Sequence, residues 1–347
     1  MKSKGINFGP YTTNYQWLGS SNRYQSYINT ISRLGNPDLT WEKRKEITAG
    51  IDVLLLRKRL SLEVNYFNTK REGIITNMSS VLPKLYGMDG IGTYENYNDI
   101  RYRGWEAALY WSDRIGKVEY TAGGSISTLK GKYLRYSENV VYDYQRVTGS
   151  ATGSYRGYVC LGKFTSREEI ETSPRQLFDD EVQVGDLKYA DLNNDGRIDS
   201  NDQCVIGHTD PRFIYAVNLH LSYKWFDLTV VGTGRAGYQV PFTNAWFWNG
   251  WGDGNYSKYT LRNAGNPDHP RLTYNKVNNN YKTSTFWLED GGFFKIQTVE
   301  LGYELPVHRL GITSIRRMRV YVRGNNLCTV SKIKDVDPEA IGSGLTN

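Results

Sequence analysis

The chain has 347 residues, a formal net charge of +7, 35 glycines and 14 % aromatic residues. It contains no run of about 18 apolar residues, which excludes a membrane-spanning helix, and no Gly-X-Y period, which excludes collagen. The basic residues are scattered, so a nucleic-acid-binding protein is not expected. Cys160, Cys204 and Cys328 are too few and too far apart for a disulfide framework or a CxxC zinc site. A membrane β-barrel fits this composition, because its strands alternate apolar and polar residues and average to a polar score.

Eight segments alternate in this way over about ten residues, the spanning length of a tilted barrel strand, whereas soluble strands average about five to six. In chain order they are 45–56, 59–68, 100–111, 117–129, 213–223, 226–232, 293–305 and a segment around 318–322. In the seventh, Phe294, Ile296 and Thr298 are expected to share a face. Strand ends carry aromatic residues, as the girdles of a membrane barrel do: Tyr66, Trp111, Tyr223 and Trp225.

The connections between these segments alternate in length. Short turns are expected around 57–58, 112–116, 224–225 and 306–314, and the intervening connections have roughly thirty, eighty and more than fifty residues. Short periplasmic turns and long outside loops are typical of outer-membrane barrels. A large secreted β-sandwich also fits the strand alternation, although its turns usually recur every 8–12 residues or so. The fold class expected is all-β: an antiparallel transmembrane β-barrel, partial, with long extracellular loops.

The sharpest local motif is an Asp-rich loop over 191–202. Oxygen-bearing side chains stand at positions 1, 3, 5, 9 and 12 of an EF-hand-type calcium loop, namely Asp191, Asn193, Asp195, Asp199 and Asp202. Gly196 permits the sharp turn, and Arg197 would offer its backbone carbonyl. Two departures are Asp202 in place of the usual Glu and an extended stretch, 185–189, where a helix would stand. The motif predicts a structural Ca²⁺ site, and the alternative is a solvated Asx-rich turn.

Aromatic residues gather in the connection between the sixth and seventh segments. Trp246, Trp248 and Trp251 form this cluster with neighbouring aromatics. Exposed aromatic rings in a loop suit stacking on a sugar or docking of a partner, so these tryptophans are candidate substrate or partner residues. The alternative interpretation, slightly favoured, is an internal core that holds the long loop together.

Patterns for catalysis are poor. The four histidines are His208, His220, His269 and His308, and no GxSxG, HExxH or P-loop pattern occurs. His220 falls on the polar face of the fifth segment, and the other three lie in loops. No catalytic residues are predicted, and we do not expect an enzyme.

Five stretches resemble the C-terminal half of SusC/RagA-type TonB-dependent outer-membrane transporters. They are 34–42 (LGNPDLTWE), 103–109 (RGWEAAL), 185–199 (GDLKYADLNNDGRID), 286–306 (FWLEDGGFFKIQTVELGYELP) and 319–327 (RVYVRGNNL), followed by Asp337-Pro-Glu339. Their order is that of the family, and together they span nearly the whole chain. Each stretch is weak evidence alone, and the set is highly specific.

The resemblance implies a 22-stranded outer-membrane barrel with an N-terminal plug. Such a transporter imports oligosaccharides or peptides, is energised through TonB and is capped by a SusD-like lipoprotein. Residues 1–347 would then be the C-terminal part of the barrel, set in outer-membrane lipid, with about eight of its strands. The signal peptide, the plug and the final strand are not found in the sequence. We therefore expect a fragment that does not transport alone; the alternative is a soluble secreted carbohydrate-binding β-protein with a dockerin-like calcium loop.

Overall fold

The computed structural model describes residues 11–21, 24–79, 93–178, 181–243, 247–248, 256–272, 279–307, 315–334 and 336–339, with the backbone only for 11–34. Two compact units divide the chain. The first contains residues 1–47, 68–102 and 131–152, and the second contains 48–67, 103–130 and 153–347. Three long strands, β3, β4 and β5, run from one unit into the other.

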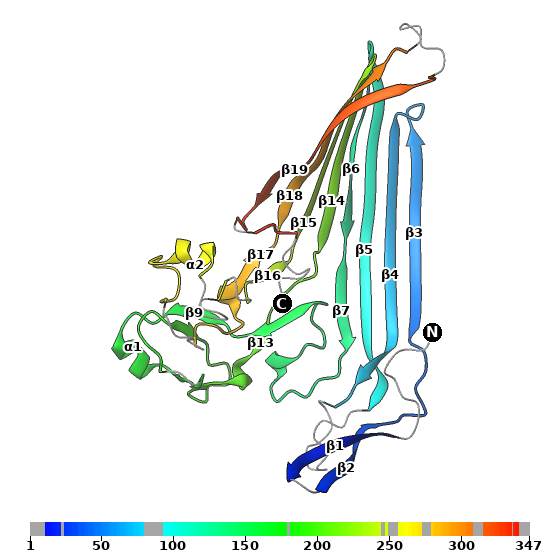
Figure 1. The fold of residues 1–347 in the computed structure, drawn as a ribbon. Helices are drawn as coiled ribbons and strands as arrows, with labels where there is room; N and C mark the ends of the chain where they lie inside the picture. The colour runs from blue at the N-terminus through cyan, green and yellow to red at the C-terminus, as the bar shows by residue number, and fades with distance from the viewer. Residues whose placement is uncertain are drawn as a thin grey trace. The chain divides into compact units, whose positions relative to one another are not determined.

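The largest sheet in the described part of the chain has nine strands (Figure 1). Their order is β19-β18-β15-β14-β6-β5-β4-β3, and β7 pairs with β5. The strands are β3 (Lys43–Leu55), β4 (Leu60–Asn77), β5 (Tyr94–Ile115), β6 (Val118–Thr128), β7 (Lys130–Arg135), β14 (Phe213–Tyr223), β15 (Phe226–Ala236), β18 (Phe293–Leu305) and β19 (Met318–Ser331).

Apolar and polar residues alternate along these strands, and tight turns join neighbouring ones. Together these features fix the pairing of the strands. β14 pairs antiparallel with β15 from Phe213↔Ala236 to Tyr223↔Phe226 without interruption. On its other side β14 pairs with β6 over its full length. The turn between β5 and β6 contains only two residues and begins at Gly116, whose φ of +63° suits glycine. An uninterrupted register keeps each strand's apolar residues on the same side of the sheet as those of its neighbours.

All eight strands predicted from the alternation are present, and the structure corrects their ends. β4 and β5 are longer than predicted, so Tyr66 and Trp111 lie inside strands, whereas Tyr223 does end β14. The turn predicted over 112–116 is shorter, because β5 continues to Ile115. A bulge at Gln297 shifts the register, with Ile296 opposite Gly232 and Thr298 opposite Val231. Thr298 therefore lies on the opposite face from Phe294 and Ile296, contrary to the prediction.

The first unit contains a hairpin that the sequence did not predict, β1 (Tyr11–Ser21) paired antiparallel with β2 (Tyr24–Leu34). It also contains β7, the short 3-10 helix η2 (Asp143–Gln145) and the long-loop ends of β3, β4 and β5. Asn96 links these ends, because its Nδ2 donates to the carbonyl oxygens of Thr40 and Gly73, each at 2.8 Å.

The second unit contains the loop elements that follow β7 and β15. They are β8 (Ser154–Gly157), β9 (Cys160–Lys163), α1 (Arg167–Thr172), β10 (Arg175–Gln176), β11 (Leu187–Tyr189), β12 (Arg197–Ile198), η3 (Ser200–Asp202), β13 (Cys204–His208), β16 (Gln239–Pro241), α2 (Lys258–Asn263), η4 (Thr285–Trp287) and β17 (Leu288–Asp290). The short strands form four two-stranded sheets in the described residues. Neither α1 nor α2, the α-helices of the described ranges, is long and apolar enough to cross a membrane.

Candidate functional site

One face of the nine-stranded sheet is apolar although its side chains are exposed. Along β14 the odd-numbered residues from Phe213 to Tyr223 lie on this apolar face, opposite even-numbered residues of β15 such as Leu228 and Val230. Exposure reaches 47 % at Val217, 52 % at Leu301 and 75 % at Val322. A sheet of a soluble protein packs such a face against a second layer, whereas a barrel wall turns it toward lipid.

The opposite face, the polar face, carries a chain of ion pairs across β15, β18 and β19. Arg319 Nε donates to Asp227 Oδ1 at 3.0 Å, and Arg319 Nη2 donates to Glu300 Oε1 at 2.7 Å. Arg323 Nε donates to the second oxygen of Glu300 at 2.6 Å. His220 also lies on this face, as predicted, with Nδ1 3.0 Å from Thr229 Oγ1. Charged side chains on one face and apolar ones on the other are what a water-filled barrel requires.

A cleft of about 620 Å³ lies on the polar face, at the end of the sheet where short turns such as the one between β14 and β15 join the strands. Its lining includes His220, Asp227, Glu304, Arg317 and Arg319, so both signs of charge are present. Arg317 Nη2 reaches Glu304 Oε2 at 2.8 Å. The polar face therefore carries paired charges of both signs at this end of the sheet.

The loops of the second unit have a core of their own. Phe242, Phe247, Trp248 and Trp287 are buried there with Tyr281 and Ile333. Phe242 and Phe247 stack with ring centroids 3.8 Å apart, and Trp287 Nε1 donates to the Asn280 carbonyl at 2.9 Å. A second core contains Tyr158, Phe178, Leu187, Tyr189 and Ile198. Long loops that carry two aromatic cores are held in a defined conformation.

These cores account for one residue of the aromatic cluster. Trp248 is buried, with its ring centroid 5.8 Å from that of Tyr281 and 6.3 Å from that of Trp287. The alternative interpretation, a core inside the long loop, therefore describes Trp248. Trp246 and Trp251 lie outside the described residues. Their contact with a substrate or partner stays a prediction.

The Asp-rich loop folds around its own backbone. Asp191 accepts from the N–H groups of Asp195 at 3.3 Å and Gly196 at 2.9 Å, and Asn193 Oδ1 accepts from Asp195 N at 3.1 Å. Gly196 has a φ of +79°, as the sharp turn requires. Asp191, Asn193 and Asp195 thus surround one turn, which fits the first half of a calcium loop.

In the second half of the predicted calcium loop, the acidic side chains accept hydrogen bonds from the backbone. Asp202 is fully buried and accepts from Leu192 N at 2.8 Å and from Asp199 N at 2.9 Å. Asp199 accepts from Asn201 N at 2.7 Å and caps η3. Among the described residues, no three His, Cys, Asp or Glu side chains are grouped so that they could hold a metal. Ca²⁺ binding by Asp191, Asn193, Asp195, Arg197, Asp199 and Asp202 stays a prediction.

A buried acid that sequence reasoning passed over connects the loops. Asp186 is fully buried and accepts from Arg271 Nε at 2.6 Å, Asn280 Nδ2 at 2.8 Å and Gln183 N at 2.8 Å. Asp186 lies in the stretch 185–199, which was noted only for its family resemblance and its Asp-rich loop. A buried carboxylate with three donors is stabilising only while all of its partners remain.

The segment after β19 is tied to the polar face in the same manner. Lys295 of β18 is 2 % exposed, and its Nζ lies 2.8 Å from Glu339 Oε2 and 3.3 Å from Asp337 Oδ2. Ile333, in the same segment, is buried in the first loop core. The Asp337-Pro-Glu339 motif thus fastens this segment at the long-loop end of the sheet.

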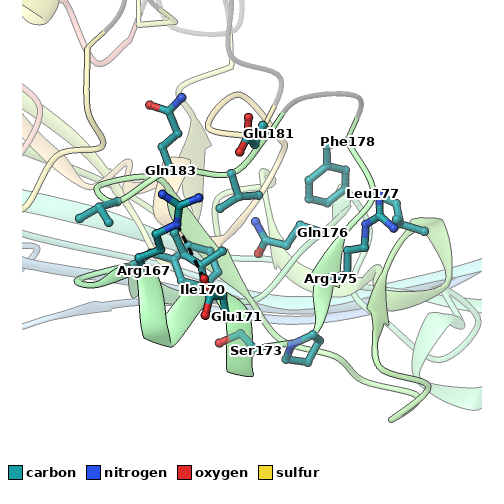
Figure 2. A pocket seen from close by; sticks show the side chains of 14 residues that line it. Arg167, Ile170, Glu171, Ser173, Arg175, Gln176, Leu177, Phe178, Glu181 and Gln183 are labelled. Carbon is teal, nitrogen blue, oxygen red and sulfur yellow. Dashed lines mark ion pairs between the residues drawn. The ribbon is translucent and has the colours of Figure 1, made fainter.

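A pocket lies among the loops, between α1 and the segments on either side of it (Figure 2). It has a volume of about 1130 Å³. Arg167, Glu171, Arg175 and Glu181 give its lining both signs of charge, and Arg167 Nε lies 3.7 Å from Glu171 Oε1. Apolar parts of the lining include Ile170, Pro174, Leu177, Val182 and Val184.

Local capping explains why α1 forms beside this pocket. Ser166 Oγ accepts from Glu169 N at 3.1 Å, and Glu169 Oε2 accepts from Thr165 N at 2.9 Å. The hydrogen bonds from Thr165, together with Lys188, lower the pKa of Glu169 to about 2. The Ser166-x-x-Glu169 pattern is the signal by which the sequence could have indicated this helix, although not the pocket.

Comparisons with known proteins agree with this two-faced sheet. No family model matches the chain. TonB-dependent receptor P26 of Formosa agariphila is 27 % identical over 335 residues, which cover 91 % of this chain and 33 % of that receptor. The chain resembles TonB-dependent receptors. TonB-dependent receptor P3 of the same organism is 26 % identical, with 89 % of the chain and 32 % of the receptor covered. The chain thus spans about a third of the length of the curated relatives it matches.

Solved structures give the same fold. The RagAB peptide transporter matches 95 % of this chain with a TM-score of 0.68 and 19 % identity, over 36 % of its own length. The RagAB peptide importer in its open-open state matches with a TM-score of 0.66. The predicted resemblance, the partial outer-membrane barrel fold and the outer-membrane location are therefore confirmed. The relatives are receptors and transporters by name, rather than enzymes.

Proposed function

We propose that the chain forms part of the barrel wall of an outer-membrane, TonB-dependent importer of peptides or oligosaccharides. The observation that carries this proposal is the sheet with an exposed apolar face and an ion-paired polar face, combined with the likeness to TonB-dependent receptors. A SusD-like lipoprotein is the proposed partner at the loop side. Contact with the TonB complex would be made through a region other than this wall.

The alternative, a soluble secreted carbohydrate-binding β-protein with a dockerin-like calcium loop, is disfavoured by the same face. Ile51, Leu301 and Val322 are each more than half exposed, although they lie on long strands. Their burial in a sandwich would contribute about 1.5–3 kcal/mol per side chain. A soluble protein would lose that stabilisation and expose an aggregation-prone surface.

Peptides are the substrate class that we favour. The loop pocket pairs basic and acidic side chains, Arg167 and Arg175 with Glu171 and Glu181, around an apolar lining. Such a lining suits a chain with charged ends and mixed side chains. Phe164 and Phe178 also line the pocket but are buried, so that they offer little open ring surface for stacking on a sugar. The RagAB structures are described as those of a peptide transporter.

Uptake by cells that carry the receptor tests this function. Deletion of the gene should abolish growth on a peptide mixture as nitrogen source, and the intact gene should restore it only when TonB is present. In the restored strain, Arg167→Gln with Arg175→Gln should reduce peptide uptake. Arg114→Gln, at the short turn, should leave it unchanged. If cells without the gene still grow on peptides but no longer grow on one glycan, the substrate is a glycan rather than a peptide.

The calcium prediction is kept as a separate proposal for the 191–202 loop. We expect Ca²⁺ to protect this loop from proteolysis in the receptor, because hard oxygen ligands from Asp191, Asn193 and Asp195 would close its turn. Asp195→Ala should abolish the difference between digestion in Ca²⁺ and in chelator. Asp143→Ala, an exposed acid elsewhere, is the control. Equal cleavage of the unaltered loop in Ca²⁺ and in chelator would contradict Ca²⁺ binding by this loop.

A further inference from the structure

The apolar face of β4 and β5 continues into basic residues toward the long-loop end. Tyr66 and Trp105 lie on this face, with ring centroids 4.8 Å apart. Alternation along each strand puts Lys70, four residues after Tyr66, on the same face, and likewise Arg103 and Arg101, two and four residues before Trp105. The outward face therefore changes from aromatic to cationic within about 13 Å of strand.

The neighbouring strand adds two more cations. Glu72 shares the face of Lys70, and its carboxylate lies 2.5 Å from Lys70 Nζ and 2.6 Å from Lys45 Nζ of β3. Lys43 precedes Lys45 by two residues and shares its face. We call Lys43, Lys45, Lys70, Arg101 and Arg103 the outer basic cluster. Lys43, Lys45 and Arg101 are exposed, with the Lys45 side chain 68 % exposed, and Lys70 is half-buried.

The positive charge of this cluster is only partly neutralised. Glu72 is shared between two lysines, and Asp99 accepts from Gly73 N at 2.9 Å and pairs with Arg135 at 3.4 Å. Glu95 stands further out on β5, beyond Tyr97. On the opposite face of the same strands each arginine has an acidic partner: Arg44 pairs with Glu46 at 2.5 Å and Arg71 with Glu42 at 2.6 Å. The excess of cations therefore points outward.

The height of the cluster matches a lipid headgroup. From Ile115 at the short turn to Trp105, β5 advances ten residues, about 33 Å, and a tilt of about 40° reduces this to a height of about 25 Å. That height is the thickness of the apolar band of an outer-membrane barrel. Trp105 then lies at the outer edge of the band, and Arg101 lies just beyond it.

We propose that the outer basic cluster binds the phosphorylated headgroup of a lipid in the outer leaflet. The inference rests on the proposed function, which turns the long loops outward. Guanidinium groups pair with phosphate through two parallel hydrogen bonds, and ammonium groups add point charge. Trp105 and Tyr66 would lie beside the upper part of the acyl chains, where amphipathic rings are favoured. The cluster would thus link the loop end of β3–β5 to the membrane surface.

The test uses the full-length receptor that carries this chain, purified in detergent and mixed with bisphosphorylated or dephosphorylated lipid A. Binding is measured by native mass spectrometry. The unaltered receptor should prefer the phosphorylated lipid. The variant Lys43→Gln, Lys45→Gln, Lys70→Gln, Arg101→Gln, Arg103→Gln should lose that preference, at roughly fivefold in affinity for each cation removed. Arg44→Gln with Arg71→Gln, on the opposite face, should keep it.

Each outcome of this test decides the proposal. Equal binding of both lipids by the unaltered receptor, or an unchanged preference in the variant without these cations, would overturn it. Full competition by inorganic phosphate at millimolar concentration would assign the cluster to a soluble anion, which also contradicts a lipid site. A far-UV β-sheet spectrum checks that the variant folds. Substrate uptake is scored separately, so that loss of lipid preference with normal uptake, or the reverse, separates this proposal from the proposed function.

Discussion

Single buried charges hold the loops of this protein in place. Asp186 anchors two loop segments through Arg271 and Asn280, and Lys295 holds the segment that contains Asp337 and Glu339. Neither role follows from sequence pattern, because the partners of Asp186 are 85 and 94 residues distant. The sequence does indicate local roles, such as the cap that Glu169 and Ser166 form on α1.

Asp186→Ala should destabilise the loop cores by about 3–5 kcal/mol, because it leaves the Arg271 guanidinium and the Asn280 amide without their shared acceptor. Hydrogen exchange at the amides of Leu187 and Tyr189 measures this loss directly. Asp143→Ala removes an exposed ion pair and should leave the same amides protected. Unchanged exchange in Asp186→Ala would show that the polar network is not what holds these segments.

The loop cores should weaken in acid through His269. Burial lowers the pKa of His269 below its usual value of about 6.5, so the unfolded chain binds the proton more readily than the folded one. This contribution to stability is complete above about pH 6.5 and is lost as the pH falls through the lowered pKa. Lys163, which is bonded to the His269 carbonyl, adds to the lowering.

His269→Phe tests this pH dependence. Phenylalanine keeps an aromatic ring next to Tyr259, Phe286 and Trp287 and removes the proton site. Protease resistance of the loops between pH 7 and pH 5 should fall in the unaltered protein and fall less in the variant. If protease resistance falls equally with pH in both proteins, groups other than His269 cause the weakening in acid.

Strands were the most predictable elements. All eight long alternating segments are strands, because the period of two reflects a lipid face and a polar face directly. Their ends were predicted less well. β4 and β5 extend beyond their apolar stretch, where polar residues such as Asn96 bond neighbouring strands and the alternation gives no signal. The bulge at Gln297 was also missed, because an extra residue in one strand is visible only against its partner.

Assignment of the two faces predicts opposite effects for adjacent residues of β14. Val217 lies on the apolar face in the middle of the strand, and Asn218 lies on the polar face next to Tyr110. Val217→Arg should destabilise the protein in lipid vesicles by about 2–4 kcal/mol, since it places a charge at the middle of the bilayer. Asn218→Arg should have little effect. Urea titration of both variants measures the difference, and equal losses would contradict the assignment.

At the scale of the whole molecule, the order of short and long connections was sufficient to predict a barrel wall. The loop structure was not predictable, because its short strands pair across long sequence distances and its cores combine residues such as Trp248 and Ile333. The aromatic run around Trp248 indicated that a core or a binding surface would form, without deciding between them. The pocket beside α1 combines several short segments, none of which is distinctive alone.

If this chain forms part of the wall of an outer-membrane barrel, as we propose, its long loops lie outside the cell. Single cysteines in a background in which Cys160, Cys204 and Cys328 are replaced by alanine test it, by reaction with a membrane-impermeant maleimide on intact cells. Val141→Cys and Leu261→Cys, at loop residues exposed by 76 % and 62 %, should react from outside. Lys117→Cys, in the short turn, should react only after the outer membrane is permeabilised. Reaction of Lys117→Cys on intact cells, or protection of both loop positions, would contradict the account.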